Sequence, residues 1–354
     1  MVFQPNKPYN DLALLPPDPA KYESIEIYKK LKEARASLAE LKGRLPIIPN
    51  PAMLINTLVL QEAKSSSEIE NILTTTDKLF RAFSANTKNI DSATKEVLNY
   101  RNSLWSAFNE NKTTDQNWII KIFKEITKKD EGIRDIQVYI RNAFQTVYTP
   151  PQPEVLTKKL SNWLDFFCQS DAIDPLIKMA MLHYQFEAIH PFSDGNGRTG
   201  RILNVIYLTK QNLINLPVLY LSKHILEFKN EYYRLLKGVT ENGNWHDWIL
   251  FNLETVLRTS TFTLEKVNEI YDLFTSVKNE IQTKAPEIYS YELVEIIFSQ
   301  VYCKNKIMVE NNIASRNTVT KYLKKLVDLK ILKPKREGKE ILYLNTGLYE
   351  ILSK

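Results

Sequence analysis

Residues 190–201 gather side chains suited to handling a phosphate, in the order His-Pro-Phe-Ser-Asp-Gly-Asn-Gly-Arg-Thr-Gly-Arg. Glycines ahead of a helix let backbone N–H groups approach an anion, and the helix N-terminus adds positive potential. Arg198 and Arg201 are three residues apart, so on a helix they share a face and can both fork onto phosphate oxygens. The pattern predicts a phosphate site in a glycine-rich turn that leads into a helix.

Three further side chains extend this site. Asp194 is a carboxylate suited to holding a divalent cation against phosphates, and Asn196 offers a neutral donor. His190 precedes the loop and can take a proton from an incoming hydroxyl group, because its pKa is ordinarily near neutrality. The spacing fits neither a P-loop nor the Gly-x-Gly-x-x-Gly dinucleotide turn. A polar loop without function is the alternative. The whole chain holds only nine Gly and four His, so chance would rarely bring three glycines and a histidine together with two arginines in twelve residues.

At every specified position this stretch resembles the motif of the Fic family, His-Pro-Phe-x-Asp/Glu-Gly-Asn-Gly-Arg-x-x-Arg. The resemblance implies transfer of AMP from ATP, with Mg²⁺, to a Ser, Thr or Tyr hydroxyl of a target protein or of the chain itself. It assigns His190 as the base and Asp194 as the metal ligand. Of two adjacent tyrosines, we assign Tyr232 to the nucleotide. The residues expected to bind the phosphates are Gly195, Asn196, Gly197, Arg198, Thr199, Gly200 and Arg201.

A second pattern lies on a helix predicted over about residues 54–73. Ser66 and Glu70 are four residues apart and share a helical face, for which a solvated surface helix is the plain alternative. Ser66-x-x-x-Glu70-Asn71 resembles the inhibitory-helix signature of Fic proteins, Ser/Thr-x-x-x-Glu-Gly/Asn. The resemblance implies that Glu70 pairs with Arg201 and withholds it from the ATP γ-phosphate. An alternative keeps the site but reverses it, with Glu70 orienting water to remove AMP from a modified target.

Residues 132–140 change the hydrophobic period. Ile136, Val138 and Ile140 alternate with other residues, which predicts a short strand, and residues 146–148 are its expected hairpin partner. The stretch resembles the Fic flap, which implies that a target segment adds to it as a further strand. The expected target-binding residues are Gln137, Val138, Tyr139 and Ile140.

Helical periodicity dominates the rest of the chain and predicts a mostly α protein. We expect an N-terminal helical region over residues 1–110, a catalytic domain over 111–256, a connecting helix over 257–285, and a C-terminal domain over 286–354. In the last of these, two helices and then two short strands follow in helix-turn-helix order. This order resembles the winged helix found at the C-terminus of some Fic proteins.

The positive charge is concentrated near the C-terminus. Residues 301–340 hold eleven Lys and Arg against four Asp and Glu, a net charge of +7, whereas the whole chain carries +6. A basic recognition helix favours DNA, but docking and dimerisation modules are also lysine-rich, so DNA, a protein partner and a homodimer stay open. A DNA-binding regulator that senses nucleotide through its Fic domain is therefore a third functional alternative.

The remaining composition bears on location. Cys168 and Cys303 lie far apart in the sequence and suit a reducing compartment. The first residues lack a signal-peptide pattern, and no uncharged apolar run approaches the length of a membrane span. The sequence therefore predicts a cytoplasmic protein without a membrane partner.

Overall fold

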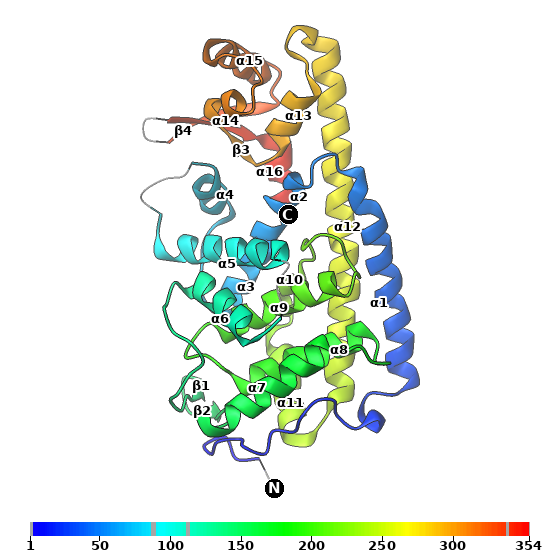
Figure 1. Ribbon diagram of the computed structural model, residues 1–354. Coiled ribbons are helices and arrows are strands. Elements are labelled where there is room, and N and C mark those ends of the chain that lie inside the picture. The colour runs from blue at the N-terminus through cyan, green and yellow to red at the C-terminus, as the bar shows by residue number, and fades with distance from the viewer. Residues whose placement is uncertain (1–2, 86–89, 111–113, 338–339, 354) are drawn as a thin grey trace.

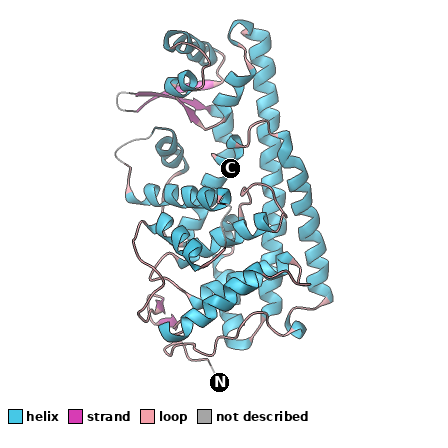
Figure 2. Ribbon diagram, in the orientation of Figure 1, coloured by secondary structure: helices cyan, strands magenta, loops and turns pink. Residues whose placement is uncertain are grey.

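The computed structural model describes residues 3–85, 90–110, 114–337 and 340–353. The described chain is mostly helical, as expected (Figure 2). No helix in these ranges is both long and apolar enough to cross a membrane.

Two long helices form one side of the molecule. α12 (Trp245–Lys284) runs from the central part of the chain to the C-terminal part, with α1 (Ile25–Arg44) packed beside it (Figure 1). Lys30 Nζ lies 2.8 Å from Glu254 Oε2, and Arg44 Nε lies 2.7 Å from Asn268 Oδ1. The expected boundary between residues 256 and 257 therefore falls inside one continuous helix.

Further helices follow α1 along the chain. These are α2 (Ala52–Ile55), α3 (Leu58–Ile69), α4 (Thr76–Ala85), α5 (Ser92–Asn109) and α6 (Gln116–Thr127). The helix expected over residues 54–73 is thus interrupted and shorter. Thr57 Oγ1 donates to the carbonyls of Met53 and Leu54, a local bond that competes with helix continuation.

The end of α3 has an equally local cause. Asn71 adopts a left-handed conformation with φ of 63°. Asn71 N donates to Glu68 O, and Ile72 N donates to Ser67 O, both at 3.0 Å. Asn and Gly are the residues that tolerate this conformation after a helix, which explains why Asn71 follows Glu70 directly. Glu70 is therefore the C-terminal cap of α3 and not an interior residue.

The central part of the chain is built around two buried helices, α8 (Pro175–Ile189) and α9 (Asn196–Lys210), which pack against each other. They are surrounded by α7 (Pro153–Cys168), α10 (Leu221–Glu227), α11 (Lys229–Asn242) and the first turns of α12. Two tryptophans from different helices bond to the backbone of α8. Trp163 Nε1 of α7 donates to Leu182 O at 2.8 Å, and Trp248 Nε1 of α12 donates to Ala180 O at 2.7 Å.

Residues 3–18 follow an irregular path across α7 and α8. Asn162 holds Leu15 at both its N–H (2.8 Å) and its carbonyl (3.0 Å), and Gln185 Nε2 donates to Ala13 O at 2.7 Å. Short 3₁₀ turns connect the longer elements at Pro19–Lys21, Leu45–Ile47 and Pro286–Ile288.

The flap contains less strand than the sequence predicts. Only β1 (Ile140–Arg141) and β2 (Thr146–Tyr148) pair, antiparallel and with an irregular register. The expected strand at 136–139 is wrong, because side chains bind the carbonyls that a strand would use. Arg134 Nη1 donates to Ile136 O at 3.0 Å, and Gln137 Nε2 donates to Val138 O at 3.1 Å.

The C-terminal part combines helices with a small sheet. Its helices are α13 (Tyr291–Phe298), α14 (Asn305–Glu310), α15 (Arg316–Asp328) and α16 (Thr346–Ser353). Its strands, β3 (Tyr302–Cys303), β4 (Leu332–Glu337) and β5 (Glu340–Asn345), form an antiparallel sheet in the order β3-β5-β4.

Polar contacts tie this C-terminal part to the N-terminal helices. Asp77 of α4 accepts from Tyr302 Oη at 2.5 Å and lies 3.0 Å from Lys335 Nζ of β4. Arg81, one turn further along α4, pairs with Glu337 at 2.9 Å. Gln61 of α3 donates to Leu352 O at 2.9 Å. The helix that carries Ser66, α3, is therefore bonded directly to the last helix of the chain.

We expect Asp77→Asn to lower the free energy of unfolding by about 1–2 kcal/mol, since charge-assisted hydrogen bonds are replaced by weaker neutral ones. Burial opposes the charge, but the hydrogen bonds from Tyr302 and Lys335 hold the pKa of Asp77 below its usual value. A lowered pKa stabilises the fold above the unfolded-state pKa and stops doing so as the pH falls through the folded-state value. Urea unfolding at pH 7 and at about pH 3.5 should therefore show a smaller difference between the two proteins in acid. An equal difference at both pH values would contradict this assignment.

Candidate functional site

The loop from His190 to Asn196 joins the two buried helices. His190 caps α8 in a left-handed conformation with φ of 51°, and its N–H donates to Phe186 O at 3.0 Å. Gly195 precedes α9 with φ of 69°. A Cβ atom on Gly195 would also lie 2.8 Å from Thr127 Cγ2. Glycine is thus required at this turn by both conformation and space.

Three motif residues shape the loop and have no side chain free for a ligand. Asn196 Oδ1 accepts from Phe192 N, and Asn196 Nδ2 donates to Phe192 O, both at 2.9 Å. Thr199 Oγ1 donates to Gly195 O at 2.9 Å. A Cβ atom on Gly200 would lie 2.7 Å from Glu187 Oε1, so this glycine permits close packing of α9 on α8.

Arg201 is buried and bonded to the end of α3. Its Nε donates to Ser66 Oγ, and its Nη2 donates to both Ser66 O and Glu70 Oε1, each at 2.8 Å. Only 1% of Arg201 is exposed. Burial opposes its charge, yet the adjacent Glu70 carboxylate leaves the pKa of Arg201 above its usual value. The expected pair of Glu70 and Arg201 is present in the structure, with Ser66 as a third partner.

The Glu70 carboxylate lies directly over the glycine-rich turn. A Cβ atom on Gly197 would be 2.3 Å from Glu70 Oε1 and 2.9 Å from Arg201 Nη1. Glu70 can therefore approach the start of α9 only because residue 197 is glycine. An anionic oxygen at a helix N-terminus, bound to an arginine, is also where a phosphate oxygen would bind.

Two more motif charges have partners that sequence patterns did not indicate. Arg198 Nη1 lies 2.8 Å from Glu96 Oε2 of α5. Asp194 accepts from Gly195 N at 2.7 Å and lies 3.0 Å from Lys129 Nζ. Burial would raise the pKa of Asp194, but the bond from Lys129 keeps it below its usual value. Neither Glu96 nor Lys129 belongs to a recognisable spacing, so only the fold brings them to the loop.

His190 is contacted by α8 at its imidazole ring and by Arg134 at its backbone carbonyl. Nδ1 lies 3.4 Å from Glu187 O, a carbonyl that can only accept, so Nδ1 carries the proton in this contact and Nε2 keeps its lone pair. Arg134 Nε donates to His190 O at 2.8 Å. Burial and the Arg134 charge lower the pKa of His190 to about 4, so the ring is neutral at physiological pH. Arg134 thus positions His190, and no pattern in the sequence indicated it.

The tyrosine pair divides between core and surface. Tyr232 is 2% exposed, and its hydroxyl lies 3.0 Å from His183 Nε2. Its neighbour Tyr233 is 45% exposed, and burial, together with the Glu70 charge, raises its pKa to about 12. Tyr233 is therefore the more exposed residue of the two, and Tyr232 is part of the core.

The donor set fits a magnesium ion held together with phosphates. Mg²⁺ usually takes one or two protein carboxylates and completes its shell with water and substrate phosphates. Asp194 is half-exposed at the loop and offers one such carboxylate once Lys129 is displaced. In the described ranges no group of three or more His, Cys, Asp or Glu could hold a metal by itself.

A cavity of about 820 Å³ lies away from the glycine-rich turn, between α1, α10, α11 and α12. Acidic and basic side chains both line it, and no residue of 190–201 does. The glycine-rich turn, with its two arginines, one carboxylate and neutral imidazole, is therefore the better candidate for the functional site. Fold and site together define a helical protein with a glycine-rich turn, whose two arginines each pair with a carboxylate.

Known families match the chain in three consecutive parts. The Fic/DOC family N-terminal domain matches residues 28–109, the Fic/DOC family domain residues 113–208, and the C-terminal domain of the SoFic-like protein adenylyltransferases residues 273–348. The chain belongs to the Fic/DOC family.

Relatives with assigned names are similar over part of their length. The chain is 28% identical over 166 residues to the protein adenylyltransferase Fic of Nematostella vectensis, covering 46% of this chain and 37% of that protein. It is 33% identical over 108 residues to the protein adenylyltransferase fic-1 of Caenorhabditis briggsae, covering 29% of this chain and 19% of that protein. The chain thus spans well under half the length of either relative.

The crystal structure of a Fic family protein from Desulfovibrio desulfuricans G20 has the same fold. It superposes with a TM-score of 0.59 at 19% identity and covers 91% of this chain and 96% of that one. The structural likeness therefore includes the C-terminal part of the chain as well as the part that the Fic/DOC family domain matches.

We expect Gly197→Ala to destabilise the protein by about 1–3 kcal/mol, because the new methyl group meets the Glu70 carboxylate and the Arg201 guanidinium. Gly238→Ala is the matched control, since the nearest atom to its Cβ is 4.0 Å away and alanine favours a helix interior. Urea unfolding of the two variants should give changes of opposite sign.

In a Glu70→Gly background, the loss caused by Gly197→Ala should shrink, because the two changes act on one contact. An unchanged loss in that background would show that Glu70 does not lie over Gly197.

Proposed function

We propose that the chain is a protein adenylyltransferase that moves AMP from ATP to a hydroxyl side chain, Ser, Thr or Tyr, of a target protein. We propose further that Glu70 holds it in an inhibited state. The observation that carries the proposal is the Glu70 carboxylate, bound to Arg201 over Gly197, in a place suited to a phosphate oxygen. The names of the relatives support the chemistry.

In this proposal the turn binds the ATP phosphates through backbone N–H groups at Gly195, Asn196 and Gly197. Arg198 and Arg201 neutralise the phosphates, and Asp194 would hold Mg²⁺ against them. When bound, the ion supplies positive charge that stabilises the developing pyrophosphate. Thr199 and Gly200 act indirectly, by fixing the turn and the packing of α9.

The transfer itself needs one base and an aligned hydroxyl. The target oxygen attacks the α-phosphorus of ATP, the bond to the β-phosphate oxygen breaks, and pyrophosphate leaves. His190 Nε2 takes the hydroxyl proton, because Nδ1 is committed to the Glu187 carbonyl. Catalysis then rests mainly on positioning and on charge stabilisation.

The flap would hold the target beside His190. Its two sides are anchored near the imidazole, because Arg134 bonds to His190 O and Tyr148 Oη donates to Ala188 O at 2.8 Å. Tyr139 is 48% exposed and Phe144 is 94% exposed, so both are available to a bound segment. We propose that the backbone of residues 137–140 receives that segment, although only Ile140 is paired in a strand here.

Inhibition follows from the competition for Arg201. With Glu70 in place, the γ-phosphate finds no free guanidinium and meets a carboxylate instead. Like charges about 4 Å apart repel by roughly 1–4 kcal/mol at effective dielectric constants between bulk water and a protein surface. ATP can still bind through the turn and Arg198, but its α-phosphate is out of line for attack.

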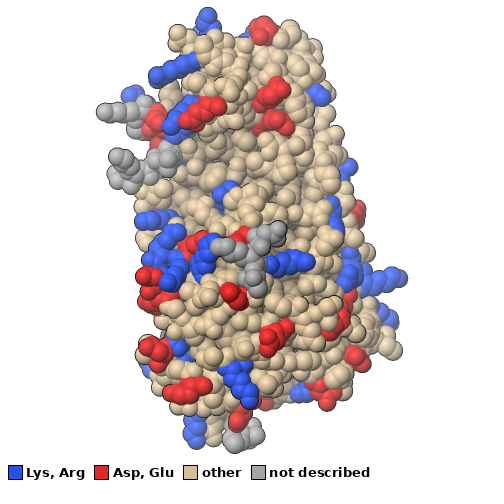
Figure 3. Space-filling model, in the orientation of Figure 1, with Lys and Arg blue, Asp and Glu red and all other residues tan. Residues whose placement is uncertain are grey.

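We also propose that residues 286–354 form a winged helix. The order of α13, β3, α14, α15, β4 and β5 supports it. Arg316, Lys321 and Lys324 are exposed on α15 and suit DNA phosphates. On the face drawn in Figure 3, however, basic and acidic residues are interspersed, and Lys325 lies 3.4 Å from Glu287. DNA, a protein partner and a second copy of the chain are therefore separate outcomes for a binding experiment.

We expect His190→Ala to abolish AMP transfer while ATP affinity changes less than about threefold, because the imidazole acts on the target hydroxyl and not on the nucleotide. In the wild type the neutral ring is the active form, so the rate should be flat near pH 7. It should fall in acid as His190 protonates, with a midpoint above about 4 because bound phosphates favour the cation. Labelled-AMP incorporation against pH checks this. A loss of ATP affinity as large as the loss of rate would contradict the role of His190.

We expect Glu70→Gly to raise the rate of AMP incorporation by about 10- to 100-fold, chiefly in turnover, because the freed Arg201 aligns the triphosphate. Arg201→Ala should remove that gain in the double variant, since both changes act on one ion pair and cannot be additive. Ser66→Ala should have a smaller effect, because it removes one neutral acceptor.

An intact-mass measurement after incubation with ATP and Mg²⁺ reads out transfer to the chain itself, and a candidate target can be added. An unchanged or lower rate in Glu70→Gly would contradict autoinhibition. If that variant also lost the ability to remove AMP from a modified target, Glu70 would be the water-positioning residue of the reverse reaction.

A further inference from the structure

Arg198, the first arginine of the turn, is held by a carboxylate from a different helix than the one that holds Arg201. Its Nη1 lies 2.8 Å from Glu96 Oε2, and its side chain is 4% exposed. Its Nε is buried and has no hydrogen-bond partner within the described part of the chain. A buried N–H group without an acceptor is unfavourable, so Arg198 has a donor to spare for a further oxygen.

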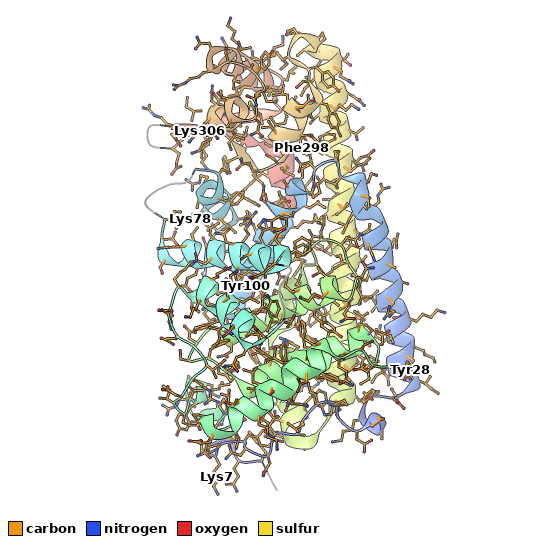
Figure 4. All side chains as sticks on the ribbon, viewed as in Figure 1. Lys7, Tyr28, Lys78, Tyr100, Phe298 and Lys306 are labelled. Carbon is orange, nitrogen blue, oxygen red and sulfur yellow. The ribbon has the colours of Figure 1, made fainter. Side chains whose placement is uncertain are left out.

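Glu96 reaches Arg198 from α5, which packs on the inhibitory helix α3. Tyr100, one turn beyond Glu96 and labelled in Figure 4, donates its hydroxyl to Glu62 Oε1 of α3 at 3.0 Å. Glu62 in turn accepts from Ser222 N at 2.9 Å, so α3, α5 and α10 are joined at one buried carboxylate. The N-terminal region therefore presents two carboxylates on neighbouring helices, Glu70 to Arg201 and Glu96 to Arg198.

The two pairs differ in what they can control. Glu70 lies over Gly197 and occupies the turn itself, whereas Glu96 contacts only the outer nitrogen of Arg198. The Glu96 side chain is 34% exposed, so it can turn towards water when a phosphate takes its place. The free energy needed to displace Glu96 should then weaken nucleotide binding, but the triphosphate that does bind should not be misaligned.

We propose that Glu96 is a second restraining carboxylate in the nucleotide site: it competes with an ATP phosphate for Arg198 and so sets the affinity for ATP, whereas Glu70 sets turnover. The proposal rests on the proposed function, because it requires that ATP binds at the turn.

The experiment is calorimetric titration of the full-length protein with a non-hydrolysable ATP analogue and Mg²⁺, without a target protein. Glu96→Gln keeps the size of the side chain and an acceptor for Arg198 but removes the charge. We expect its Kd to fall by about 3- to 30-fold, in line with a partly exposed ion pair. Raising the salt concentration should reduce the difference in Kd between the wild type and the variant, because salt screens the charge of Glu96. Glu265→Gln, an exposed glutamate in the middle of α12, is the matched control and should leave Kd unchanged.

A double variant separates the two carboxylates. Glu70→Gly and Glu96→Gln act on different arginines, so their effects on Kd should be additive in free energy. Thermal unfolding of each variant checks that Glu96→Gln is folded, and Glu96→Asp, which shortens the side chain but keeps the charge, should leave Kd closer to the wild-type value than Glu96→Gln does.

The outcomes are distinct. An unchanged Kd in a folded Glu96→Gln would show that Glu96 is a structural residue only, and a higher Kd would show that it orients Arg198 for the nucleotide. Either result overturns the proposal and leaves the proposed function intact. Failure of the wild type and of every variant to bind the analogue would overturn the proposed function and the role of Glu96 with it.

Discussion

Arg201 carries a full positive charge with 1% of its surface exposed, and this fixes what the site can contain. A buried guanidinium without an anion is strongly destabilising, so an acceptor of negative charge must always be present. In the structure Glu70 is that acceptor, and Ser66 accepts from Nε and Nη2 of the same guanidinium. A triphosphate can replace Glu70 only by providing the same charge at the same place. In the proposed function, Glu70 and a triphosphate are therefore alternatives for one position.

The rest of the fold keeps that position accurate. α8 and α9 are buried almost throughout and pack closely at Gly200, which holds the turn rigid between them. Asn71 ends α3 so that Glu70 projects from its last turn. α4 and the C-terminal sheet brace the same region through Asp77 and Lys335. Gln61 also bonds to the last helix, so the helix that Glu70 caps contacts elements far apart in the sequence.

The sequence predicted the elements whose information is local. The helical class follows from periodicity and the glycine-rich turn from its residue types, whereas the Glu70–Arg201 pair, 131 residues apart, was implied only by the resemblance to the Fic family. It could not predict Glu96, Lys129 or Arg134, because each reaches the site only through tertiary packing. It also misjudged residues 136–139, where the side chains of Arg134 and Gln137 take the carbonyls that a strand would use. Side chains that bind backbone over a distance leave no periodic signal.

The most direct test of this account is a crystal structure of Glu70→Gly with ATP and Mg²⁺, compared with the wild type under the same conditions. A γ-phosphate oxygen in the variant should occupy the place of Glu70 Oε1, within hydrogen-bond distance of Arg201 Nη2 and over Gly197. In the wild type, Glu70 should stay on Arg201 and the γ-phosphate should be displaced. A γ-phosphate bound at the same position in both proteins, or away from Arg201 in the variant, would contradict the claim that Glu70 and the nucleotide compete for one site.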